Sequence, residues 1–168
     1  MLKLSFISLL FIFSLANAEE TRHASAHVHG LNNLTMVLSQ NQIAIAYEMP
    51  IIQLYEEHEE HEEHEELAIK NKSLMEFQNH LQLFELPVGA ECELSSFKSE
   101  FHNVSTEGDH KDIELSYEFY CNEPNLLNGI QINAFDRFDD LQMVNFDAII
   151  NNQGFTKSFN SLEAKITF

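Results

Sequence analysis

The stretch LNNLTMVLSQNQIAIAYEM, residues 31–49, carries the clearest structural signal in the sequence. Apolar and polar residues alternate on both sides of the central SQNQ (residues 39–42), and a period of two is typical of half-buried strands. If the two strands pair so that the residue numbers sum to 81, apolar residues oppose one another on one face: Leu34–Tyr47, Met36–Ile45 and Leu38–Ile43. The stretch therefore predicts a β-hairpin with that face in the core.

Outward from the hairpin, the later chain also predicts strands, and one intervening segment predicts a helix. Leu67, Leu74, Phe77, Leu81 and Phe84 have approximate helical spacing, which favours a helix from about Leu54 to Leu83. Asn151-Asn152-Gln153-Gly154 is typical of a hairpin turn. Alternation predicts strands around Cys92–Phe97, Ile113–Cys121, Gly129–Phe135, Leu141–Ile150, Phe155–Phe159 and Glu163–Phe168. We expect a single α+β domain, an antiparallel β-sheet with one main helix.

The first residues have the features of a secretory signal peptide. Lys3 precedes an apolar run from Leu4 to Leu15, and Ala16-Asn17-Ala18 is a small-residue cleavage pattern. We expect residues 1–18 to be removed on export to the periplasm, leaving a His-rich segment (19–30) and the α+β domain (31–168). After cleavage no stretch is apolar and long enough to insert in a membrane. The formal net charge of −18 excludes nucleic acid as a natural partner and favours cations or basic surfaces.

Cys92 and Cys121 are the only cysteines in the chain. In an oxidising compartment they can pair in one way, and a disulfide between them would close a loop of about 30 residues, stabilising the fold by roughly 3–4 kcal/mol. The alternative is a reduced pair that ligates metal, although the sequence has no Cys-x-x-Cys spacing.

The segment EEHEEHEEHEE, residues 56–66, places a histidine at every third position of an acidic run. Imidazole nitrogen and carboxylate oxygen are ligands that suit zinc, nickel or copper(II). On a helix, neighbouring pairs such as Glu57 with His61 or His58 with Glu62 lie on adjacent turns and can chelate one ion, and His64 extends the series. The alternative is a solvated acidic run without metal.

Three other segments offer further candidate ligands. His27 and His29 in AHVHG would face the same side of an extended strand, and Glu48 would lie on that face of the hairpin as a third ligand. The polar turn before residue 112 holds His102, Asp109 and His110. The alternatives are a flexible N-terminus, an exposed strand glutamate and a solvated loop. His80 lies among apolar residues, and we expect it to be a structural histidine.

Enzyme motifs are missing from the sequence. It has no Gly-x-Ser-x-Gly, no phosphate-binding glycine-rich loop, no His-Glu-x-x-His and no cysteine beyond the expected pair. The clustered carboxylates also lack an apolar pocket that would separate their pKa values for acid–base catalysis. We therefore expect a protein that is not an enzyme.

Several motifs along the mature chain resemble the ZrgA-like family of bacterial periplasmic zinc-binding proteins. The matching segments are Ala26–Gly30 with the hairpin, the Glu/His run after Pro50, Leu83–Pro87 with Ala90–Leu94, Tyr117–Cys121 and Phe135–Phe138. The resemblance implies Zn²⁺ binding through His27, His29, His58, His61 and His64, and assistance to an ABC-type zinc importer or its periplasmic binding protein. The family's long His-rich loop between the cysteine strands is reduced here to His102, Asp109 and His110.

The sequence thus favours a periplasmic protein that collects Zn²⁺ through His/Glu-rich segments. An acidic adaptor or chaperone that binds a basic partner surface is the alternative from another class of function. A second alternative keeps metal binding but assigns sequestration of Cu²⁺ or Ni²⁺, because His-rich sites bind Cu²⁺ more strongly than Zn²⁺.

Overall fold

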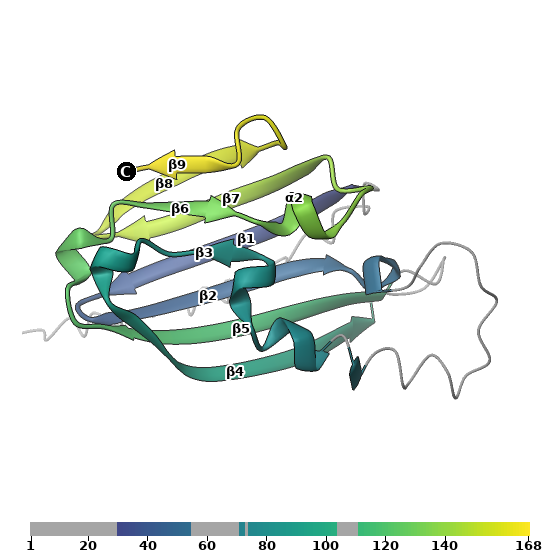
Figure 1. Ribbon diagram of the computed structural model, residues 1–168, viewed down its shortest axis with the longest axis horizontal. Helices are drawn as coiled ribbons and strands as arrows, with labels where there is room; N and C mark the ends of the chain where they lie inside the picture. The colour runs from purple at the N-terminus through teal and green to yellow at the C-terminus, as the bar shows by residue number, and fades with distance from the viewer. Residues whose placement is uncertain (1–29, 55–70, 73, 104–110) are drawn as a thin grey trace, which may run out of the picture.

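A computed structural model describes residues 30–54, 71–72, 74–103 and 111–168, which form two β-sheets in separate layers (Figure 1). The larger sheet has six strands in the order β4-β5-β2-β1-β7-β8, and the smaller has three in the order β3-β6-β9. The strands are β1 (Leu31–Ser39), β2 (Gln42–Pro50), β3 (Phe84–Glu85), β4 (Cys92–Asn103), β5 (Lys111–Cys121), β6 (Gly129–Ile132), β7 (Met143–Ile150), β8 (Gln153–Phe159) and β9 (Lys165–Thr167). Short helical elements join them: η1 (Ile51–Leu54), η2 (His80–Gln82), η3 (Val88–Ala90), η4 (Pro124–Leu126) and α2 (Ala134–Arg137).

The predicted hairpin is confirmed in its register. β1 and β2 pair antiparallel, and the residue numbers of every pair sum to 81, from Asn33–Glu48 to Ser39–Gln42. The apolar alternate positions are buried, as at Leu34, where no surface is exposed. The β7–β8 hairpin is confirmed as well, and its turn residues Asn151 and Asn152 both have positive φ angles, 52° and 62°. Asparagine tolerates this left-handed conformation better than most residues.

The expectation of an antiparallel sheet is wrong at one strand pair. β1 and β7 run parallel, with Leu31 opposite Met143 and Leu38 opposite Ile150. A parallel pair cannot be joined by a tight turn, and here the chain forms β2 to β6 and α2 before it returns beside the start of β1. The carbonyl oxygen of Gly30 accepts hydrogen bonds there from the backbone N–H groups of Gln142 and Met143. Alternation within a strand reports which face is buried but not the strand's direction.

The predicted main helix, and with it the α+β class, is also wrong. In the described part of the chain the helical segments are all short. Residues 71–72 and 74–77 are helical, and residues 55–70 and 73 of the predicted helix lie outside the described residues. Asn79 is extended (φ −82°, ψ 91°), and its side chain caps η2 by accepting a hydrogen bond from the N–H of Leu81. Leu83 and Phe84, adjacent in sequence, are both fully buried, whereas Leu81 is 48 % exposed. The apolar spacing therefore serves short turns leading into β3 rather than one helical face.

The core lies between the two sheets. Inward residues of the larger sheet, such as Tyr47, Tyr117 and Phe146, are buried together with Phe84 and Ile130 of the smaller one. The rings of Phe84 and Tyr117 meet edge to face with centroids 5.3 Å apart, a favoured arrangement for aromatic pairs. The molecule is thus a two-layer β structure, in which each sheet buries the apolar face of the other.

The Tyr117 hydroxyl also fixes the segment that precedes β3. It donates a buried hydrogen bond of 2.7 Å to the carbonyl oxygen of Phe77. Phe77 itself is fully buried, so this bond joins a short helical turn to the centre of the larger sheet.

The predicted disulfide is confirmed. Cys92 and Cys121 oppose each other across β4 and β5 and are joined by an S–S bond of 2.07 Å. The bond lies at the opposite end of this strand pair from Asn103 and Lys111, so it closes one end of the pair.

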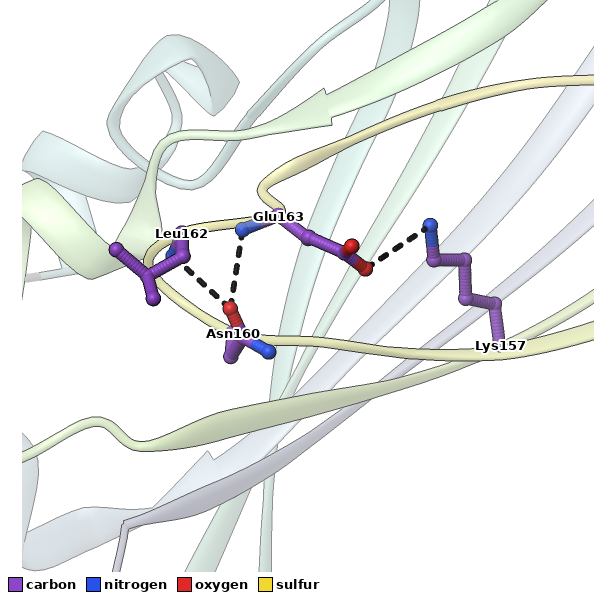
Figure 2. A network of polar contacts seen from close by, with 4 residues as sticks. All are labelled: Lys157, Asn160, Leu162 and Glu163. Atoms are coloured by element: carbon purple, nitrogen blue, oxygen red, sulfur yellow. Dashed lines mark hydrogen bonds and ion pairs between the residues drawn. The ribbon is translucent and has the colours of Figure 1, made fainter.

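The turn after β8 is held by polar contacts (Figure 2). The side-chain oxygen of Asn160 accepts hydrogen bonds from the N–H groups of Leu162 and Glu163, at 2.9 and 3.0 Å. The Lys157 ammonium lies 3.8 Å from the Glu163 carboxylate. These contacts reverse the chain between β8 of the larger sheet and β9 of the smaller one (Figure 1).

Candidate metal centre

The strand ends next to the three predicted His-bearing segments lie at one end of the larger sheet. β2 is antiparallel to both β1 and β5, and β5 is antiparallel to β4. The start of β1, the end of β2, the end of β4 and the start of β5 therefore share one end of the sheet (Figure 1). Adjacent strands are about 4.8 Å apart, so the four ends span roughly 14 Å. Because neighbouring strands run in opposite directions, strand ends as far apart in sequence as Leu31 and Lys111, 80 residues, lie at the same end of the sheet.

Most of the predicted ligands are outside the described residues. His27 and His29 come before β1 in sequence, His58, His61, His64, Glu57 and Glu62 follow η1, and Asp109 and His110 come between β4 and β5. His102 lies on β4, where its backbone is opposite Asp112. The structure therefore describes the strand ends next to these segments, and one predicted ligand, Glu48, in full.

Glu48 lies on β2, half-exposed, on the face of the larger sheet that is turned away from the smaller one; this is the outer face. Its neighbours in register are Asn33 on β1 and Glu114 on β5, and Glu114 in turn opposes Glu100 on β4. Three glutamates thus form a row across adjacent strands, with directly opposed Cβ atoms about 5 Å apart. The Ser116 hydroxyl donates a 3.0 Å hydrogen bond to the Glu114 carboxylate.

Glu100 and Glu114 are not among the ligands predicted from the sequence. Glu114 alternates with the buried residues of β5, so its outward direction can be read from the sequence. Its position beside Glu48 depends on which residues of β2 and β5 pair, and these strands are more than 60 residues apart. Like charges on directly opposed positions destabilise a sheet, so a row of this kind favours cations nearby.

Comparison with protein families identifies the chain. A family model described as "ZrgA family zinc uptake protein" matches residues 26–168. The chain belongs to the ZrgA family. No curated protein matches it. The family match begins at Ala26, so it contains AHVHG, the Glu/His run and both sheets. Membership gives the protein a role in zinc uptake, and it associates the chain with zinc rather than with a class of enzymes.

Asp112 is a further acidic residue at the same end of the ZrgA-family sheet. It lies on β5 opposite Pro50 and His102, and only 1 % of its surface is exposed. In the described ranges no group of three or more His, Cys, Asp or Glu side chains is close enough to hold one metal ion. In the same ranges no helix is long and apolar enough to cross a membrane.

His80 packs against aromatic rings in the core. Its ring centroid is 4.8 Å from that of Phe119 and 5.4 Å from that of Phe84, and the residue is half-buried. Burial lowers the pKa of His80, and the nearby carboxylate of Glu85 partly opposes this effect. The neutral ring is therefore favoured, and its surroundings are those of a packing residue.

Proposed function

We propose that this ZrgA-family protein collects Zn²⁺ in the periplasm through its His/Glu segments and passes it to an ABC-type importer. The proposed ligands are His27, His29, His58, His61 and His64, with Glu57, Glu62, Glu48, His102, Asp109 and His110 as further donors. Neutral imidazole and carboxylate together suit zinc.

One observation carries the proposal. The four strand ends next to the His-bearing segments lie on neighbouring strands, within roughly 14 Å. Segments that begin at such close points have a high effective concentration relative to one another, which favours binding of one ion by ligands from different segments. The acidic row of Glu48, Glu114 and Glu100 is at the same end and raises the local concentration of cations.

Membership of a zinc uptake family supports zinc as the metal, and the grouped strand ends are a reason for its capture at this end of the sheet. The strand ends belong to a sheet that packs on a second sheet, which holds them near one another. Zinc binding also has to compete with protons for the imidazole nitrogens. Affinity should therefore fall as the pH drops through the histidine range, near 6–6.5.

The test compares two variants of the full chain by calorimetry and metal analysis. The first replaces His27, His29, His58, His61 and His64 with Ala, and it should lose most bound zinc. The matched control replaces an equal number of acids, Glu56, Glu59, Glu60, Glu63 and Glu65, with Gln, and it should keep most of it. If the histidine variant binds zinc as the wild type does, the ligand assignment is wrong.

Two further measurements separate the remaining alternatives. Titration of the wild type at pH 7.5 and 5.5 should give weaker binding at the lower pH, and equal affinities would contradict histidine ligation. Native mass spectrometry of the protein purified from periplasm should report zinc. Copper or nickel in its place would favour sequestration of those metals.

A further inference from the structure

A row of small and apolar side chains crosses the outer face of the larger sheet. It consists of Ala44 on β2, Val37 on β1, Ile149 on β7 and Gly154 on β8, which are successive partners in register. We call these four residues the apolar row. Val37 is 43 % exposed and Ile149 is 52 % exposed, and both alternate with buried apolar residues of their own strands. Apolar side chains collected on one exposed face are typical of an interaction surface.

The apolar row borders a shallow hollow of about 340 Å³, lined by residues of β1, β7 and β8. The hollow exists partly because Gly154 has no side chain; a Cβ atom added there would meet nothing within 4 Å. Val37 and Ile149 supply its exposed apolar side chains, and Thr35, Asp147 and Thr156 also line it. The surface can therefore receive an apolar side chain of a partner.

Two carboxylates flank the apolar row. Glu118 opposes Ala44 at one end, and Asp147 precedes Ile149 by two residues on β7. The Asp147 carboxylate is held in place by a 2.7 Å hydrogen bond from the Thr156 hydroxyl. Farther from the row, Glu48, Glu100 and Glu114 toward the proposed zinc-binding end and Glu93 on β4 point to the same face, and Lys98 is the one lysine or arginine among the outward-facing side chains that the structure describes on it. The apolar row thus lies near the β1–β2 and β7–β8 turns, on an acidic face, with Glu118 and Asp147 beside it.

We propose that the apolar row docks a partner protein whose surface has an apolar side chain flanked by Lys and Arg. Opposite charges at a rim steer association and select the partner, while the apolar centre supplies affinity. A second copy of this chain is a poor occupant, because each copy has a formal net charge of −18 and would oppose one acidic rim to another. The partner is therefore a different, basic protein.

The apolar row is separate from the proposed zinc-binding end. Val37 comes six residues after Leu31 along β1, which corresponds to about 20 Å. Docking at the row would leave the strand ends accessible. Variants in the row should therefore change partner binding without changing zinc binding, so this inference and the proposed function can fail independently.

The test begins with the full chain in cells, with a photo-cross-linking amino acid at Ile149. The control places it at Val88, which is 84 % exposed in η3, away from the outer face. The adduct specific to Ile149 is identified by mass spectrometry, and that protein is purified and titrated with the wild type. The expected result is one adduct at Ile149 that is absent at Val88, with a basic protein.

The titration is then repeated with I149K and with V88K, which carries the same charge change at the control position. I149K should weaken binding about tenfold or more, because it puts a cation at the centre of a surface that meets a basic partner. V88K should bind as the wild type does, and zinc stoichiometry should be equal in both variants. The double variant D147N/E118Q should bind more weakly and depend less on salt.

Three results would overturn the docking proposal: no adduct specific to Ile149, an adduct of the chain with a second copy of itself, or equal affinity of I149K and the wild type. Since Ile149 points outward, I149K should leave the core intact, and its circular dichroism spectrum should match that of the wild type.

Discussion

The hydrogen bond between the Tyr117 hydroxyl and the Phe77 carbonyl can be removed by one conservative substitution, Tyr117→Phe. Tyr117 is 1 % exposed, and the bond is 2.7 Å long and buried. Burial raises the pKa of Tyr117 well above its usual value, so the hydroxyl stays protonated and donates throughout the working pH range. Without it the buried carbonyl loses this donor, and leaving a buried acceptor unsatisfied costs about 1–3 kcal/mol. We expect Tyr117→Phe to lower the free energy of unfolding by that amount.

Urea unfolding, followed by circular dichroism with the disulfide intact, measures this difference. The matched control is Tyr120→Phe, since Tyr120 lies on the same strand with its side chain 51 % exposed. Its loss should change stability by less than about 0.5 kcal/mol. Hydrogen exchange should also show faster opening around Phe77 in the first variant. If Tyr117→Phe stays within 0.5 kcal/mol of the wild type, the bond does not hold this segment to the sheet and the reasoning fails.

Three further changes test other parts of the fold. Replacing both Cys92 and Cys121 with Ala should lower the free energy of unfolding by about 3–4 kcal/mol in urea titrations, and zinc stoichiometry should be unchanged if no thiolate is a ligand. Burial lowers the pKa of His80 in the folded state, so as the pH falls the unfolded chain takes up a proton at His80 before the folded chain does. The stability of the wild type should therefore fall relative to that of His80→Gln as the pH drops below about 6.5. Parallel stability profiles of the two proteins against pH would refute this. Gly129→Ala should cost about 1–3 kcal/mol, since its Cβ would collide with the backbone oxygen of Ile166, while Gly154→Ala, whose Cβ meets nothing, should show no loss in thermal melts.

The acidic row and the apolar row have the same structural origin. Each is made by residues that alternate outward on strands far apart in sequence. Glu48 meets Glu114 because β2 pairs with β5, and Val37 meets Ile149 because β1 pairs with β7. A change of register by one residue in either pair would turn one partner into the core and remove the row.

Local chemistry in the sequence was sufficient for several features. The alternation in residues 31–49 determined which face of the β1–β2 hairpin is buried, and pairing its apolar positions across a short turn predicted the observed register. Two cysteines allowed one intramolecular disulfide, and Asn151-Asn152 supplied residues that accept positive φ. The family resemblance read from AHVHG and the later motifs was confirmed by the family match.

The tertiary structure alone decided the β class, the parallel β1–β7 pair and the grouping of four strand ends at one end of the sheet. The apolar spacing from Leu74 to Phe84 fits a helical face, but the second sheet buries Phe77, Leu83 and Phe84 through short turns instead. The spacing of apolar residues in the sequence indicates which residues face the core. Which strands pair, and in which direction, depends on how two whole layers cover each other's apolar faces, and no single segment carries that information.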